Sequence, residues 1–161
     1  MWVTGDTGNA VRNADTVLVL FGPRNSSGEP FCSAETGRII EGMQRYGVRR
    51  ILCVTGAMIG AYPENRTRFF QLLTDWVQRH YPVMMDDRAQ QERLVQESGL
   101  DWTIFKPPRL SGADASGRIV LGSSVTVGML SKVSRADLAA AMLDEVVQGR
   151  FVGQCAFVRN V

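Results

Sequence analysis

The residues with the clearest potential for chemistry are Lys106-Pro107-Pro108-Arg109-Leu110. They follow Trp102 to Phe105, an aromatic and β-branched run that predicts a strand buried on both faces. Because Pro107 and Pro108 have no N–H group to donate, strand pairing has to end there. In an open α/β sheet, ligands bind beyond the carboxyl ends of the strands. We therefore expect Lys106 to Leu110 to line a binding site.

The rest of the chain offers few acid–base groups in a familiar arrangement. There is no Tyr-x-x-x-Lys pair, since Tyr81 is followed four positions later by Met85. His80 is the only histidine, and its place near a predicted helix end favours capping of a carbonyl over catalysis. The three cysteines have no metal-like spacing, and Cys53 lies in an apolar run that predicts inert core. We expect neither tyrosine-based proton donation nor a metal site.

The composition is that of an ordinary soluble protein. With 161 residues, 45% hydrophobic and 21% charged, we expect one domain spanning residues 1–161 and no disorder. A formal net charge of +2 gives no reason to expect nucleic acid binding. We expect no leader peptide, and no apolar run approaches the roughly 18 residues of a membrane-spanning helix. We therefore expect a cytoplasmic protein.

Strands and helices alternate around the candidate site. Thr16 to Phe21 and Ile51 to Val54 predict buried strands. Ser33 is the expected cap of the helix between them, which ends at Gly47, and Ser98-Gly99 ends the helix before the next strand. The other expected elements are a helix capped by Asn65, a helix starting at Asp86, a strand over residues 118–121, a helix from Ser134 to Val147 and a strand over residues 151–158.

The helix capped by Asn65 has an unusually broad apolar face. Its apolar residues are Phe69, Phe70, Leu72, Leu73, Trp76 and Val77. Such a face favours burial in the core, with a partner interface as the alternative.

Three segments together resemble one family. Ser98 to Pro108, SGLDWTIFKPP, resembles a motif of the atypical short-chain dehydrogenases, the NmrA-like NAD(P)-binding proteins. Val17 to Asn25 resembles a strand of that family that ends in G-x-R-N, and Gly47 to Ala57 resembles its next strand and loop. The double proline makes the flavin reductase and biliverdin reductase B group the most similar.

The resemblance implies a Rossmann-like parallel sheet flanked by helices, with NADP or NAD as cofactor. Carried over by position, Gly22 and Arg24 would contact the middle of the dinucleotide. Thr55 would contact the nicotinamide ribose, and Gly56 follows it at the start of the loop. Pro107, Pro108, Arg109 and Leu110 would contact the nicotinamide face. Relatives often have histidine where Arg109 stands, and an arginine there would suit a phosphate or an acidic substrate. Arg88 matches a family lysine that contacts the nicotinamide ribose, with a solvated arginine at a helix start as the alternative.

The amino end departs from the family pattern. The segment Thr4 to Asn9, TGDTGN, can be aligned with the family in two ways. In the first it is a variant of the phosphate-binding loop, with Gly5 and Gly8 at the pyrophosphate. In the second, Gly5-Asp6 is the pair that follows the third strand of the family. In both cases about two βα units, roughly 50 to 60 residues, are missing, so the fold is expected to be truncated in its N-terminal half. Sheet topology favours the first alternative, with a strand at Trp2 to Thr4 beside the Thr16 strand.

Two functions remain open. One is an NAD(P)H-dependent reductase of flavin-like or quinone-like small molecules. The other is a catalytically inactive binding or oligomerisation module, whose shortened sheet forms a homo-oligomer. NADP cannot be preferred over NAD, because the residues that recognise the 2′-phosphate follow a strand that is missing here.

Overall fold

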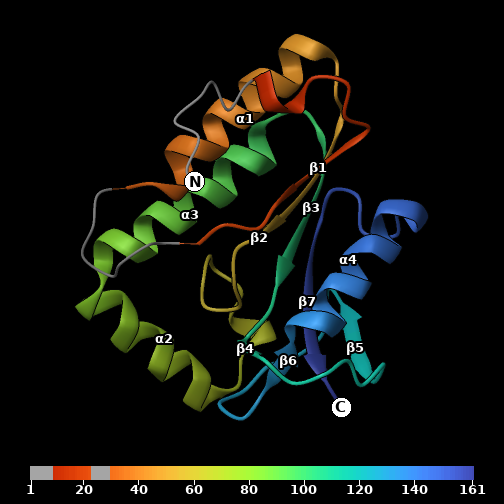
Figure 1. Cartoon of the computed structure of the whole chain (residues 1–161). Coiled ribbons are helices and arrows are strands. Elements are labelled where there is room, and N and C mark those ends of the chain that lie inside the picture. The colour runs from red at the N-terminus through yellow and green to blue at the C-terminus, as the bar shows by residue number, and fades with distance from the viewer. Residues whose placement is uncertain (1–8, 23–29) are drawn as a thin grey trace.

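The computed structural model describes residues 9–22 and 30–161. A five-stranded sheet runs through the middle of the molecule in the order β1-β2-β3-β7-β5 (Figure 1). Its strands are β1 (Thr16–Val19), β2 (Arg50–Val54), β3 (Asp101–Lys106), β7 (Gln154–Asn160) and β5 (Ile119–Gly122). The first four are parallel, and β5 pairs antiparallel with β7. The expected α/β class with a parallel sheet is therefore confirmed.

Helices cover both faces of the sheet. α1 (Cys32–Tyr46) and α3 (Pro82–Glu97) lie on one face, and α4 (Arg135–Gln148) lies on the other (Figure 1). Neighbouring strand residues alternate accordingly, because side chains of a strand point to opposite faces in turn. Ile51 and Ile104 pack into the core of α1 and α3, whereas Leu52 and Phe105 pack into the core of α4.

The two prolines end the pairing of β3, as predicted. The last residue of β3 that pairs with β7 is Lys106, which lies opposite Phe157. The chain then turns into β4 (Arg109–Ser111), which pairs with β6 (Lys132–Ser134) in a separate two-stranded parallel sheet. This second sheet was not expected from the sequence, because each of its strands is only three residues long.

The beginning of α4 agrees with its expected capping box. The Ser134 side chain accepts a hydrogen bond from the backbone nitrogen of Asp137. The Asp137 carboxylate accepts hydrogen bonds from the backbone nitrogens of Ser116 and Gly117 and from Nδ2 of Asn160. One side chain of α4 thus joins the loop after β4 to the last strand.

Three helix starts differ from the sequence prediction. Ser33 does not cap α1, because the carboxylate of Asp87 occupies that position. The cap of α2 (Arg68–His80) is Thr67 and not Asn65. Asn65 ends the short 3-10 helix η2 (Pro63–Asn65), and the Asn65 side chain donates to two carbonyl oxygens of the loop after β5. α3 begins four residues earlier than Asp86, at Pro82, a residue well suited to a first helical turn.

The apolar face of α2 is only partly buried, so its expected burial was wrong for three residues. Phe70 is buried, but Phe69, Leu72 and Trp76 expose 76%, 64% and 49% of their surface. They are spaced three and four residues apart and therefore lie on one stripe of the helix. α2 itself lies at one end of the molecule rather than over a face of the sheet (Figure 1). His80, at the end of α2, has Nδ1 2.8 Å from the Trp76 carbonyl oxygen, which confirms its expected capping role.

The predicted strand at Trp2 to Thr4 lies outside the described residues. The description begins with the 3-10 helix η1 (Asn9–Val11), whose Val11 is buried against the core of α1. β1 is the edge of the sheet in the described part of the chain, and its flanking Leu20 is 62% exposed. None of the helices in the described ranges is long and apolar enough to cross a membrane.

Candidate functional site

A cavity of about 440 Å³ lies beyond the carboxyl ends of β2 and β3, and we call it the strand-end cavity. Its walls come from the loops after these two strands, from α2 and α3, and from the loop before β6. The lining residues are Thr55, Gly56, Ala57, Met58, Ile59, Phe70, Leu73, Val77, Met84, Met85, Arg88, Pro108, Arg109, Met129 and Ser131. The cavity lies where ligands bind in parallel α/β sheets.

Four of the predicted site residues meet at this cavity. They are Thr55 and Gly56 after β2, and Pro108 and Arg109 after β3. The carbonyl oxygen of Pro107, a buried residue, accepts a hydrogen bond of 2.9 Å from the backbone nitrogen of Ala57 and so ties the two loops together. Gly22 and Leu110 do not line the cavity. Gly5, Gly8 and Arg24 lie outside the described residues.

The backbone of Gly56 explains why glycine follows Thr55. Its φ of 136° lies in a region that residues with a side chain rarely adopt. A Cβ atom on Gly56 would lie 3.9 Å from the Pro107 carbonyl oxygen, an ordinary contact distance. The conformation, and not a lack of space, requires the glycine.

Arg88 is buried, so its interpretation as a solvated arginine at a helix start was wrong. Its guanidinium donates to the carbonyl oxygens of Phe21 and Val54, at 3.1 and 2.9 Å, and also to that of Thr55. A further bond of 2.8 Å reaches Oε1 of Gln91 on the same helix. One side chain of α3 therefore binds the ends of both β1 and β2 and lines the strand-end cavity.

Asp87, the neighbour of Arg88, fills the amino end of α1. Its carboxylate accepts hydrogen bonds from the backbone nitrogens of Phe31, Cys32 and Ser33 at 2.8 to 3.1 Å. Burial alone would raise the pKa of Asp87, but the hydrogen bonds from Ser33, Cys32 and Phe31 hold it below the usual 3.8. The first N–H groups of α1 are thus bound by the protein's own side chain and do not offer a phosphate site.

Lys106 does not line the cavity, which corrects one sequence prediction. It is fully buried, and its Nζ donates to Oε2 of Glu92 at 2.6 Å and to the Ile59 carbonyl at 2.8 Å. The ammonium also lies 4.4 Å from the centre of the Tyr62 ring. Burial lowers the pKa of Lys106, and the carboxylate of Glu92 counteracts that effect.

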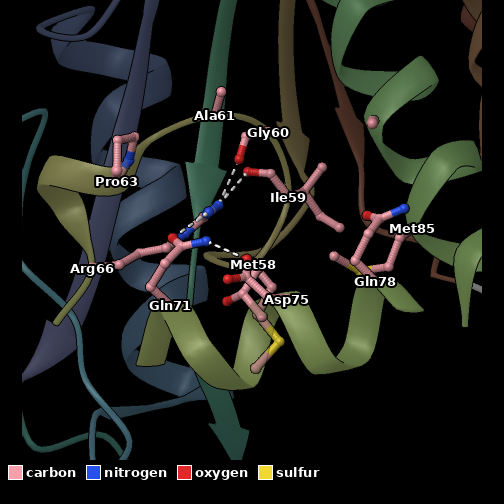
Figure 2. Close-up of a pocket in the computed structure, with 12 residues that line it drawn as sticks. Met58, Ile59, Gly60, Ala61, Pro63, Arg66, Gln71, Asp75, Gln78 and Met85 are labelled. Atoms are coloured by element: carbon pink, nitrogen blue, oxygen red, sulfur yellow. Dashed lines mark hydrogen bonds between the residues drawn. The ribbon is translucent and has the colours of Figure 1, made fainter. Parts of the chain in front are cut away.

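A second cavity, of about 400 Å³, lies between α2, α3 and the loop of residues 58–66 (Figure 2). Figure 2 shows Arg66 donating to the carbonyl oxygens of Ile59 and Gly60, and Gln71 joining Arg66 to Asp75. The polar groups of Arg66, Gln71 and Asp75 are therefore hydrogen-bonded within the protein itself. Met58, Ile59 and Met85 line this cavity and the strand-end cavity alike, so the two are neighbours around α2.

The wall of the strand-end cavity is apolar and rich in methionine. Met58, Met84, Met85 and Met129 line it, four of the seven methionines in the chain. Methionine is flexible and polarisable, and it packs well against aromatic rings. Such a wall suits a flat ring, while Thr55 and Arg109 provide polar groups at its edge.

Several residues of this site were not foreseen. Glu92, Met84, Met85 and Met129 carried no local signal, because each is brought to the site by an element distant in the sequence. Arg88 was noted only through its family position. A buried polar row on α3 of Asp87, Arg88, Gln91 and Glu92, at spacings of one, three and one residues, is the signal that marks this helix face.

Comparisons with known proteins agree with this geometry. A family model described as NAD(P)H-binding matches residues 3–148. A Burkholderia pseudomallei structure, provisionally named an exported protein, is 26% identical with a TM-score of 0.71, over 95% of this chain and 75% of that one. A Streptococcus pneumoniae protein, provisionally named an NADH-flavin reductase, is 17% identical with a TM-score of 0.71, over 96% and 75% of the chains.

A further solved structure is a short-chain dehydrogenase/reductase from Veillonella parvula in complex with NADP. It is 19% identical with a TM-score of 0.72, over 96% of this chain and 66% of that one. The structures below 25% identity establish the Rossmann-like fold. The chain spans between two thirds and three quarters of the length of these three structures.

Proposed function

Because the chain belongs to the NAD(P)H-binding family, we propose that the strand-end cavity holds a nicotinamide ring beside a flat acceptor and that hydride passes between them. The acceptor class we propose is flavin-like or quinone-like. The observation that carries this proposal is the cavity itself, which Thr55, Pro108 and Arg109 line together with apolar side chains.

The described residues fit the nicotinamide half of the cofactor. Hydride transfer mainly needs two rings held face to face, and a cavity of about 440 Å³ is within the usual range for small-molecule sites. When bound, the cofactor supplies the hydride, and the protein supplies position and exclusion of water. Thr55 lines the cavity and donates its hydroxyl group to Glu92 behind it, and Pro108 and the methionines supply apolar groups.

Calorimetric titration of the purified chain with NADPH and with NADH tests the binding. We expect a micromolar dissociation constant for at least one of the two. Met84→Trp, which would fill the cavity, should weaken binding at least tenfold. Leu143→Trp is the matched control, because Leu143 is exposed on α4, and it should bind as the wild type does. No binding up to millimolar cofactor would overturn the proposal.

Oxidation of NADPH, followed by absorbance with FMN or menadione as acceptor, tests the reaction. We expect saturable turnover with at least one acceptor. Binding of the cofactor without turnover of any flavin or quinone would refute the reductase and leave a nucleotide-binding protein.

The exposed edge of the sheet favours a second candidate, an oligomerisation module. β1 has no neighbour on its outer side among the described residues, and edge strands can pair with a second chain. Sedimentation equilibrium distinguishes the two functions. A concentration-dependent dimer that binds no cofactor would support the module, and a monomer would refute it.

A further inference from the structure

Glu92 is the centre of a buried hydrogen-bonded cluster. Its Oε2 accepts from Nζ of Lys106 at 2.6 Å and from the Thr55 hydroxyl at 3.0 Å. Its Oε1 accepts from the Tyr62 hydroxyl at 2.8 Å. Glu92 and Lys106 are both almost completely inaccessible to solvent. Each carboxyl oxygen therefore has a hydroxyl partner, and the two hydroxyl groups lie on different sides of Glu92.

The two hydroxyl partners belong to different cavities. Thr55 lines the strand-end cavity, where the proposed reaction takes place. Tyr62 lines another cavity, of about 310 Å³, together with Gln96 and Cys155, and we call it the Tyr62 cavity. The Tyr62 oxygen lies 3.1 Å from both the Cys155 sulfur and Nε2 of Gln96. An unbroken chain of hydrogen bonds thus joins two cavities through the protein interior.

An ion pair alone does not account for this arrangement. Neutralising Lys106 requires one carboxylate contact, and burial of a charged pair is often no more stabilising than apolar residues of the same size. The cluster adds one hydroxyl group to each carboxyl oxygen of Glu92, and each hydroxyl belongs to a residue that lines one of the two cavities. Burial raises the pKa of Tyr62, so the phenol is protonated at pH 7 and its hydroxyl group donates the hydrogen bond to Glu92.

We infer that Thr55, Glu92 and Tyr62 form a proton relay that carries a proton from the Tyr62 cavity to the acceptor in the strand-end cavity. The inference rests on the proposed reductase function and deepens it, because reduction of a quinone by hydride leaves an oxygen that needs a proton. It also supplies a proton route in a chain without a Tyr-x-x-x-Lys pair.

The transfers balance as follows. The bound cofactor would supply the hydride that forms the new bond to the quinone. The quinone oxygen that gains the electron pair would then take the Thr55 hydroxyl proton. Thr55 takes the proton that Lys106 Nζ donates to Oε2 of Glu92, which leaves Lys106 neutral. Tyr62 gives its proton to Oε1 of Glu92 and regains one from water in the Tyr62 cavity. A half-turn of the carboxyl group returns the new proton to the Lys106 side.

Tyr62→Phe is the first test, with NADPH and menadione as the probe reaction. The variant keeps the ring beside Lys106 and removes only the hydroxyl group. We expect kcat to fall about a hundredfold or more, as for loss of a general acid route. The solvent deuterium isotope effect should rise, and the effect of deuterated NADPH should fall, because proton delivery becomes rate-limiting. Tyr81→Phe changes an exposed tyrosine and should leave all three quantities unchanged.

Thr55 supplies the second test. Thr55→Ser keeps the hydroxyl group and should keep most of the activity, whereas Thr55→Val should lose as much as Tyr62→Phe. The double variant Thr55→Val/Tyr62→Phe should be no slower than the slower single variant, because residues that act in one path are not additive.

The outcomes separate the relay from the proposed function. If the wild type neither binds NADPH nor reduces menadione, the proposed function and the relay both fall. If the wild type reduces menadione and both single variants stay within twofold of it, the relay falls and the reductase stands. A loss of activity without any change in the isotope effects would show a structural role of Tyr62 and would also overturn the relay.

Discussion

The Asp87 carboxylate on α3 lies 2.8 Å from the backbone nitrogen of Cys32, the first residue of α1. It also binds the backbone nitrogens on either side, so a side chain 55 residues away in sequence caps the helix. The start of α1 is thereby fixed by a side chain of α3. The same helix holds the strand ends through the next residue, Arg88.

Asp87→Ala should lower the free energy of unfolding by about 1 to 2 kcal/mol, the usual effect of losing a helix cap. Urea denaturation at pH 7 measures it. Asp86→Ala is the matched control, because Asp86 is exposed and its carboxylate accepts a hydrogen bond from the side chain of Gln78. The control should stay within about 0.5 kcal/mol of the wild type. Equal losses in both variants would contradict the cap.

The cap should also depend on pH. The pKa of Asp87 in the folded protein lies below the usual 3.8, so the stabilisation is present above pH 3.8 and is lost as the pH falls through the lower, folded value. The difference in unfolding free energy between the wild type and Asp87→Ala should therefore be constant from pH 7 to 5 and shrink below about pH 4. A difference that grows on acidification would contradict this assignment.

The capping of α1 shows one limit of sequence reasoning. Ser33 carries the local signature of a cap, but it lies two residues after Phe31, the observed cap position, and is already inside the helix. Its own hydroxyl group, however, donates to the same Asp87 carboxylate at 2.5 Å. A helix start can be read from neighbouring residues, but the group that satisfies it can come from any element that packs beside it.

Phe69 and Phe70 provide a matched pair on α2. Phe70 is 4% exposed and lines the strand-end cavity, so Phe70→Ala should lower the free energy of unfolding by about 3 to 5 kcal/mol. Phe69 is 76% exposed, so Phe69→Ala should change it by less than about 0.5 kcal/mol. Thermal and urea denaturation of the two variants measure these values. A large loss for Phe69→Ala would show that its ring is covered in solution by another chain.

The position of α2 explains why its burial was overestimated. The apolar residues predict the helix and its buried side, including Phe70. They do not show whether a second layer covers the remaining apolar stripe, because that depends on where the helix lies relative to the sheet. α2 lies at the strand ends, where Phe69, Leu72 and Trp76 have no neighbouring layer in the described residues.

Arg109 should recognise an anionic group on the acceptor. Arg109 lines the cavity, and a guanidinium group binds phosphate well. FMN and riboflavin differ by one phosphate group, so comparing them isolates that contact. Arg109→Ala should raise the KM for FMN about fivefold to tenfold and leave that for riboflavin within about twofold. Arg49→Ala is the control, because Arg49 lies at the opposite, amino end of the strands and pairs with Asp101. Equal changes for FMN and riboflavin would exclude phosphate recognition by Arg109.

The sequence predicted which loops line the strand-end cavity, but not the buried Lys106–Glu92 pair behind them. Thr55, Gly56, Pro108 and Arg109 follow buried strands, and parallel topology alone brings them to one edge. Lys106 belongs to the strand itself. It has the same parity as Ile104, which faces α1 and α3, so the alternation of the strand directs it toward Glu92 on α3. The sequence therefore predicts the face of the sheet on which Lys106 lies, but it does not identify Glu92 as the carboxylate that pairs with it.

Gly60 lies so close to the relay that it cannot carry a side chain. A Cβ atom there would lie 2.6 Å from Cε2 of Tyr62 and 2.8 Å from Oε1 of Glu92. Its φ of 75° is also unfavourable for other residues. Gly99 is the matched control, because its φ is 72° and nothing lies within 4 Å of the corresponding position.

Gly99→Ala should therefore lower the free energy of unfolding by about 1 kcal/mol, from the backbone alone. Gly60→Ala should lose about 1 to 3 kcal/mol more, since Tyr62 and Glu92 have to move apart. Urea denaturation of both variants measures the difference, and the menadione reaction shows whether the displaced Tyr62 still supplies protons. Equal losses would mean that Tyr62 and Glu92 shift at no cost, and the cluster around Glu92 would then be too loose to hold a relay in place.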